Sequence, residues 1–318
     1  MAKQAGEEQG SFERFEARIR RFWRWVTTPQ VILSLVMLFV MFYMVIIPLY
    51  RMLMTTITFS ESDVRYAPGA VPGDFTFFHW VRMLSSKVST IMTYEPLLHS
   101  LTISLGATFF AFVIGGALAW MVVRTDMPGR HTINVLATVP YIMPSWTIAM
   151  AWKVLFNNGT TGGMPGFLMY LTGTPPPDWI SYGPVPIIVS SALHYYTFFF
   201  LFVSAALMSI DSSLEEAGEL AGASRWRILR KITFPLVIPA LLSGFIMTFS
   251  KTMGTFGGPN ILGVPVRYYT MSTMLRSNTQ VGAFGDGFVL AIVLILFSMT
   301  TIFLNQRIVG TRKSYETI

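Results

Sequence analysis

Few side chains in this sequence could carry chemistry, and the most polar cluster within a long apolar segment is His194, Tyr195 and Tyr196. An imidazole and two phenols there could line a pathway or a gate, although the histidine could equally be a packing residue and the tyrosines interfacial anchors. The four histidines are scattered without metal-ligand spacing, so no metal site is predicted. The lack of cysteine excludes disulfides, thiolate metal sites and thiol catalysis. No G-x4-G-K-S/T sequence is present, so the chain itself is not expected to hydrolyse ATP.

The composition places these residues in a membrane. Of 318 residues, 53% are apolar and 12% are charged, whereas a soluble domain has roughly 25% charged residues. An ordinary water-soluble enzyme is therefore excluded. In so apolar a chain, the net charge of +7 fits cytoplasmic loops and anionic lipid headgroups rather than nucleic acid.

Six apolar segments are long enough to cross the membrane, since a helix needs about 20 residues to span about 30 Å of hydrocarbon. The sequence therefore predicts an all-α membrane protein. No acidic residue falls within the core of a predicted span, which argues against a proton- or sodium-coupled carrier. The predicted spans are residues 31–50, 97–123, 133–156, 185–208, 234–249 and 288–304.

Pro140 and Pro144 both lie within the third predicted span. Each proline removes a backbone hydrogen-bond donor, so kinks are predicted there. The kinks could shape a pathway or serve packing alone. The two prolines therefore join the histidine and tyrosines above as candidate pathway or gate residues.

Lysine and arginine are concentrated in residues 1–30, in the turn after the second span, in the loop after the fourth, and in the tail 310–318. By the positive-inside rule, both termini are expected to be cytoplasmic, with residues 31–309 forming one six-helix domain. The remaining loops are external and rich in glycine and proline. The N-terminal segment is predicted to be an amphipathic helix in the headgroup plane, because its apolar residues are spaced by three and four: Phe12, Phe15, Ile19, Phe22 and Val26.

Residues 211–235, between the fourth and fifth spans, are predicted to form a cytoplasmic helix–turn–helix. Ser212 with Glu215, and Ser213 with Glu216, both fit a capping box at a helix start. Gly222 suits a turn with positive φ, and Ser224 can cap a second helix that leads into the fifth span. A cluster of small residues would let another surface approach closely: Ala217, Gly218, Ala221 and Gly222.

The stretch Glu216-Ala217-Gly218-x3-Gly222-x9-Ile232-x-Phe234-Pro235 resembles the EAA loop of permease subunits of binding-protein-dependent ABC importers. That family's pattern is E-A-A-x3-G-x9-I-x-L-P. Two positions differ, because Gly218 replaces the second alanine and Phe234 replaces leucine. The resemblance implies the six-helix fold of type I importer permeases, here preceded by the amphipathic N-terminal helix.

In that family, two permease subunits form the pathway in the bacterial inner membrane and two cytoplasmic ATPase subunits drive it with ATP and magnesium. The resemblance implies these partners here, with a second permease that is a related but different chain, and a substrate-binding protein outside. It also implies an ATPase-coupling role for the residues that match the motif: Glu216, Ala217, Gly218, Gly222, Ile232 and Pro235.

Two further stretches resemble the branch that imports ferric iron, polyamines, thiamine or phosphonates. One is the turn Arg124-Thr-Asp126-Met-Pro128-Gly129-Arg130. The other is the external loop 256–265, which would meet the binding protein or be a plain connector. Its candidate contact residues are Gly257, Gly258, Pro259, Asn260 and Gly263.

The substrate is therefore expected to be small and polar. A sugar importer permease is the alternative within this family. Outside it, the alternatives are an ATP-independent carrier or channel, and a membrane anchor that only recruits a soluble partner.

Overall fold

The computed structural model describes residues 27–65, 67, 69 and 71–310. The predicted amphipathic stripe before residue 27 and the tail 311–318 lie outside the described residues. The chain separates into two compact units, residues 1–55 and 56–318, and each is described by itself.

The described residues of the first unit contain one long helix, α2 (Pro29–Thr56). Its 28 residues continue through Pro48, and at 1.5 Å per residue the helix is about 42 Å long, enough to cross a bilayer. It extends the first predicted span at both ends. Among the described residues, α2 is the most apolar of the candidate membrane spans.

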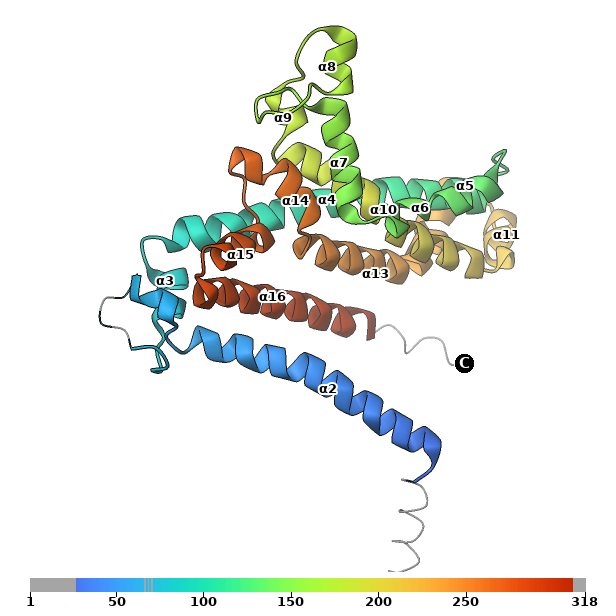
Figure 1. The fold of residues 1–318 in the computed structure, drawn as a ribbon. Helices are drawn as coiled ribbons and strands as arrows, with labels where there is room; N and C mark the ends of the chain where they lie inside the picture. The colour runs from blue at the N-terminus through green and yellow to red at the C-terminus, as the bar shows by residue number, and fades with distance from the viewer. Residues whose placement is uncertain (1–26, 66, 68, 70, 311–318) are drawn as a thin grey trace, which may run out of the picture. The chain divides into compact units, whose positions relative to one another are not determined.

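In the described part of the second unit there are four more long apolar helices, α4 (Glu95–Arg124), α10 (Pro184–Ser209), α13 (Phe234–Met253) and α16 (Phe284–Gly310) (Figure 1). They confirm the second, fourth, fifth and sixth predicted spans, and all are longer than expected. The sixth begins at Phe284 rather than at 288, so its first turn includes Asp286. A carboxylate is favoured at that position by the helix dipole.

The third predicted span is not one helix. It is divided into α5 (Arg130–Leu136), α6 (Val139–Ile142) and α7 (Ser145–Phe156), and the chain bends by 96° between α6 and α7. Met143 has ψ 144°, and Pro144 is the N-cap of α7. The residue before a proline is driven out of the helical region, so the predicted kink is a complete break. The described chain thus has five candidate spans, or six if this bent pair counts as one.

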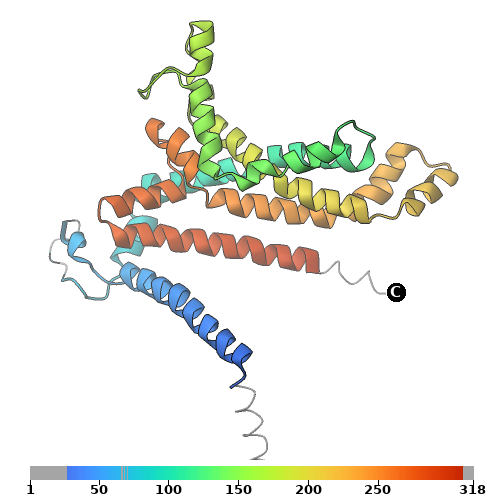
Figure 2. The same ribbon diagram turned by 45° about the vertical axis from the view of Figure 1, so that its right-hand side comes forward.

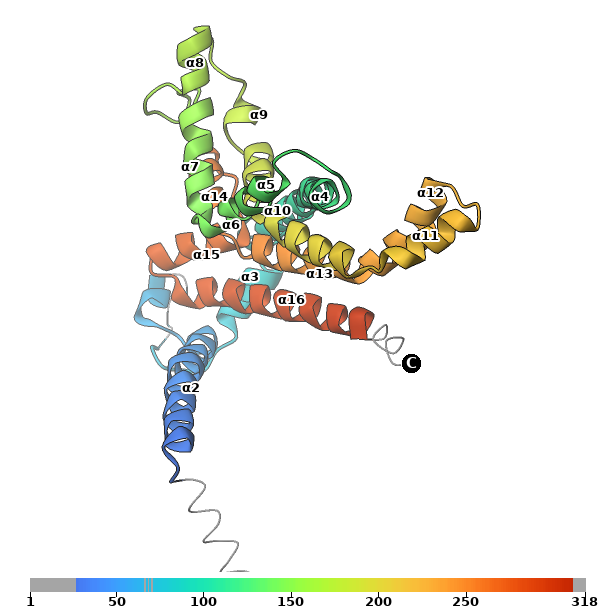
Figure 3. The ribbon, with the colours of Figure 1, turned by 90° about the vertical axis from the view of Figure 1, so that its right-hand side faces the viewer.

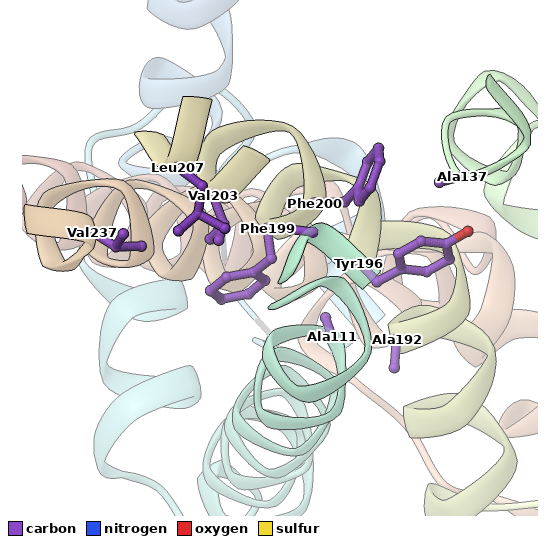
Figure 4. Packing of buried hydrophobic residues seen from close by; sticks show 10 residues of the cluster. Ala111, Ala137, Ala192, Tyr196, Phe199, Phe200, Val203, Leu207 and Val237 are labelled. Atoms are coloured by element: carbon purple, nitrogen blue, oxygen red, sulfur yellow. The ribbon is translucent and has the colours of Figure 1, made fainter. Parts of the chain in front are cut away.

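Three helices, α4, α10 and α13, form the main core (Figure 4). Phe199 of α10 packs between two glycines, because a Cβ atom at Gly115 of α4 would lie 2.8 Å from its Cβ, and one at Gly244 of α13 would lie 2.7 Å from its ring. Glycine lets helix backbones approach closely in membrane proteins. The core therefore depends on small residues facing one buried phenylalanine.

Short helices cover the two ends of this unit. One end holds η1 (Glu61–Arg65), α3 (Phe78–Ser85), η2 (Thr90–Tyr94), α14 (Gly257–Leu262), η4 (Val264–Val266) and α15 (Met271–Gln280). The helices α8 (Phe167–Thr172) and α9 (Asp178–Ser181) follow α7, which rises away from the long helices in two views (Figures 1 and 2).

At the opposite end, α11 (Ser212–Leu220), α12 (Arg225–Ile228) and the π-helical segment η3 (Leu229–Thr233) join α10 to α13. Figure 3 shows α11 and α12 projecting beyond the long helices. This places the loop 211–235 where a separate protein could reach it.

Candidate functional site

The loop 211–235 forms the predicted helix–turn–helix, but it begins differently. Asp211, not a serine, is the N-cap of α11, and its Oδ1 accepts a hydrogen bond of 2.9 Å from the Ser213 backbone N–H. The capping-box prediction for Ser212 and Ser213 was therefore wrong. Hydrogen bonds from Ser213 lower the pKa of Asp211, so the cap is charged near neutral pH.

The turn at Gly222 confirms the predicted positive φ, with a value of 77°. The Gly222 N–H donates to the Glu219 carbonyl at 2.9 Å, and the Ala223 N–H donates to the Gly218 carbonyl at 3.0 Å. These bonds satisfy the last carbonyls of α11, as a glycine-terminated helix requires. Ser224 is the N-cap of α12 as predicted, without a side-chain capping bond.

The motif residues fall into two groups. Glu216, Ala217 and Gly222 are exposed. Gly218 instead faces the second half of the loop, where an added Cβ would lie 3.1 Å from Ile228 and 3.2 Å from Ile232. Gly218 and Ile232 thus close the two halves of the loop on each other, while the exposed group is free to meet a partner.

Pro235 lies in the first turn of α13, where its missing N–H is tolerated. The π-helical turn just before it ends with the Phe234 N–H donating to the Leu229 carbonyl. A widened turn relieves the clash between the proline ring and the preceding carbonyl. Residues 225–253 can therefore continue as one helical run from the loop into the span.

Glu215 was not among the predicted site residues, yet it connects three elements. Its Oε1 lies 3.1 Å from Arg124 Nη2 at the end of α4 and accepts a 2.7 Å hydrogen bond from Thr233 Oγ1 of η3. Nothing in the spacing of the sequence pairs Glu215 with a residue 91 positions earlier. An acidic residue beside the motif and an arginine at the end of a span were the only available signals.

His194 and Thr197 hold the broken third span. His194 Nδ1 lies 2.8 Å from the Pro140 carbonyl, and Thr197 Oγ1 donates to the Ala137 carbonyl at 3.0 Å. The Pro140 carbonyl is free because its helical partner would be the nitrogen of Pro144, which carries no hydrogen. The Ala137 carbonyl is free because the Tyr141 N–H donates to Thr138 instead.

The two donors are three residues apart on α10, so they share one face. Both are buried, and a free carbonyl in a dry interior is costly. We therefore assign His194 a structural role at the break. A role in the pathway stays a prediction for His194, Pro140 and Pro144.

His194→Leu is expected to lower stability by about 1–3 kcal/mol, because it leaves the Pro140 carbonyl buried without a donor. His194→Asn keeps an amide N–H near the position of Nδ1 and should retain most of that stability. The melting temperatures of both purified variants check this. Equal losses in the two variants would contradict the structural role and favour a need for the imidazole itself.

Tyr195 and Tyr196 are buried rather than interfacial. Tyr196 belongs to the main core (Figure 4), whereas the ring of Tyr195 stacks on Phe198 at 6.2 Å. Their placement fits packing of α10. A gating role for either tyrosine stays a prediction.

The stretch 257–263 packs inward more than expected. Gly258, Pro259 and Gly263 are buried. An added Cβ at Gly257 would lie 2.8 Å from Trp146 Cβ, so this glycine lets α14 approach α7. These four residues serve packing in the described structure, and Asn260 is the exposed candidate. Contact between this stretch and a binding protein stays a prediction.

Comparison with known proteins decides the family. The family described as "Binding-protein-dependent transport system inner membrane component" matches residues 14–312, which include the loop 211–235 and all the helices discussed above. The chain belongs to this family. It is thus a non-catalytic, multi-pass component of the inner membrane, and the resemblance seen in the loop is confirmed.

Curated relatives of the permease are distant. A putative 2-aminoethylphosphonate transport system permease protein, PhnV of Salmonella typhimurium, is 27% identical over 76% of this chain and 82% of that protein. The molybdenum transport system permease protein ModB of Escherichia coli is 26% identical over 56% of this chain and 79% of that protein. A probable sulfate transport system permease protein, cysT of Marchantia polymorpha, is 23% identical over 66% of this chain and 71% of that protein.

Solved structures confirm the predicted fold. A chain of a bacterial alginate ABC transporter, in complex with a periplasmic protein bound to alginate pentasaccharide, has a TM-score of 0.66 over 93% of this chain and 99% of that chain, at 18% identity. A chain of the MetNI methionine ABC transporter has a TM-score of 0.53 over 71% of this chain and 98% of that chain, at 19% identity. At these identities the likeness shows the fold alone.

The permease also contains a buried charged cluster that no spacing in its sequence indicates. His79 of α3 lies between two carboxylates, with Nδ1 3.1 Å from Asp286 and Nε2 3.3 Å from Asp63 of η1. Arg82 Nη1 lies 3.3 Å from the other oxygen of Asp286. The histidine and both aspartates are nearly inaccessible to solvent. The cluster ties residues 61–85 to the start of α16.

Burial by itself lowers the pKa of His79, but the hydrogen bond and charge of Asp286 and the charge of Asp63 outweigh it, so the pKa is raised. Because the pKa is raised, the charged histidine stabilises the fold fully at pH values below the ordinary histidine pKa of about 6.5. This contribution is lost as the pH rises through the pKa of His79 in the folded protein.

His79→Gln is therefore expected to lower the melting temperature most at pH 6 and below, where the free energy of unfolding should fall by about 1–3 kcal/mol. The difference in melting temperature between the wild type and the variant should become smaller as the pH rises. Melting curves in detergent from pH 5.5 to 9 measure this, with the exposed His131→Gln as control. A difference in melting temperature that becomes larger as the pH rises would contradict the stabilising role of the charged histidine.

Proposed function

We propose that this permease forms one half of the translocation pathway of an ATP-driven importer. The observation that carries the proposal is the projecting loop 211–235. It presents Glu216, Ala217 and Gly222 to a partner, and its second half, from Arg225, runs without a break into α13. A stiff connection from an exposed loop to a span is what the transfer of ATPase closure into helix movement requires.

In this proposal the loop and both termini are cytoplasmic, and an ATPase dimer binds the loop. ATP and magnesium are used by that ATPase. The second half of the pathway is a related permease chain, and a binding protein delivers the substrate at the other side. Family membership favours this arrangement over an ATP-independent carrier or channel and over a passive membrane anchor.

For the substrate, we propose a small oxyanion of the phosphonate type. Phosphonate is one of the four substrate classes indicated by the sequence, and the names of three relatives refer to 2-aminoethylphosphonate, molybdenum and sulfate transport. Iron(III), polyamines, thiamine and sugars are the competing classes.

Uptake by proteoliposomes that contain the permease with its ATPase and partner permease tests both proposals. Binding protein loaded with labelled 2-aminoethylphosphonate, sulfate, molybdate, iron(III), spermidine, thiamine or a sugar is added outside. We expect uptake of one oxyanion only, and only with hydrolysable ATP inside. Uptake without ATP would contradict the importer, whereas ATP-driven uptake of another class would contradict the oxyanion alone.

A further inference from the structure

Glu215 is placed to connect the projecting loop to two membrane helices at once. It lies in the first turn of α11. Its Oε1 contacts Arg124, the last residue of α4, and Thr233, the last residue of η3. Two contacts from different elements to one oxygen fix the side chain in one position.

The burial of the three residues supports a rigid connection rather than a surface ion pair. The side chains of Arg124 and Glu215 are 18% and 26% exposed, and Thr233 is 2% exposed. Exposed ion pairs contribute little because water screens them and both side chains must be ordered. Partial burial and the hydrogen bond from Thr233 reduce both effects.

The surrounding charges show that Arg124 depends on Glu215. A cavity of about 470 Å³ beside the pair is lined by one other carboxylate, Glu219, one other basic residue, Arg225, and by Trp120 and Trp226. Among the described contacts, Arg124 forms its ion pair with Glu215, and neither its Nε nor its Nη2 has a hydrogen-bond partner, so the charge of Glu215 rather than a hydrogen bond holds the guanidinium. Glu219 lies one turn later on α11 and offers a matched carboxylate outside the connection.

We propose that Glu215 is a positioning residue that transmits movement of the loop to α4 through Arg124 and to α13 through Thr233. Thr233 directly precedes the turn in which α13 begins, so a displacement of α11 reaches that helix at its first residue. Arg124 receives the same displacement at the end of α4. Both helices belong to the main core, so they move as one body with α10. This inference rests on the proposed importer function.

The test uses the reconstituted transporter and measures uptake and ATP hydrolysis together. Glu215→Gln keeps an oxygen that accepts from Thr233 but removes the charge that holds Arg124. We expect unchanged assembly with the ATPase and retained ATP hydrolysis, but about tenfold less substrate taken up per ATP, as loss of one charge-assisted contact predicts. Glu219→Gln, the matched control, should leave this ratio unchanged.

The charge exchange Arg124→Glu with Glu215→Arg provides the second variant. Each single exchange places like charges together and should reduce the uptake ratio, while the double exchange should restore much of it. Normal coupling in Glu215→Gln, or a double exchange no better than the singles, would overturn the inference. Loss of ATPase assembly in Glu215→Gln would also overturn it, because Glu215 would then be a docking residue. ATP-driven uptake by the wild type must be present in each case, and its absence would instead refute the importer.

Discussion

Replacement of Gly222 by tyrosine is expected to reduce ATP-driven uptake by about five- to thirtyfold, because a left-handed backbone costs an L-residue roughly 1–2 kcal/mol, a factor of about 5 to 30, before any clash with a partner is counted. Gly222 has φ 77°. No atom lies within 4 Å of the position that its Cβ would occupy. The Cβ of the new side chain therefore meets no neighbour within the chain, and the exposed turn leaves room for the ring on the surface proposed to meet the ATPase.

The variant should still insert into the membrane and fold, since the turn lies outside the main core. Gly222→Asn is the matched control, because asparagine tolerates this backbone region and carries a small side chain. Uptake and ATPase retention measured side by side check the prediction. Normal uptake by the tyrosine variant would count heavily against the loop as the coupling contact.

Gly115→Leu is expected to prevent folding of the second unit. A Cβ atom at Gly115 would clash with the Tyr196 carbonyl oxygen and would lie 2.9 Å from the Phe200 nitrogen. Both are backbone atoms of α10, so no side-chain rotation relieves the contact and the two helices must separate. Even Gly115→Ala should cost about 1–3 kcal/mol, the usual range for overpacking.

Gly116 is the natural control, because an added Cβ there meets no atom within 4 Å. Gly116→Ala should stabilise α4 by about 0.5–1 kcal/mol, since alanine is the better helix former. The recovery of monodisperse protein and its melting temperature distinguish the three variants at the two positions. A folded Gly115→Leu protein with a normal melting temperature would contradict the packing of α4 against α10.

Features that depend on local sequence were predictable. Long apolar runs located the helices now numbered α2, α4, α10, α13 and α16. The spacing from Glu216 to Pro235 located the loop, and Gly222 marked its turn. Pro144 marked the break in the third span, but neither its 96° bend nor the donors from α10 that bind the carbonyls at the break.

Contacts between distant segments were not predictable. Glu215 finds Arg124, and His79 finds Asp63 and Asp286, only after the helices have packed. Glycines in the stretch 257–263 suggested an accessible loop, yet four of its residues are buried, because glycine also permits close packing. The N-cap of α11 was misplaced by one or two residues, because aspartate and serine are equally good caps.

The central claim is that this chain works as half of an ATP-driven pathway. Gentle purification of the permease from its native membranes, followed by quantitative mass spectrometry of everything that stays bound, tests it most directly. The account predicts an ABC ATPase and a second related permease in amounts stoichiometric with this chain. Recovery of this chain alone under several mild conditions, without a bound ATPase, would contradict it.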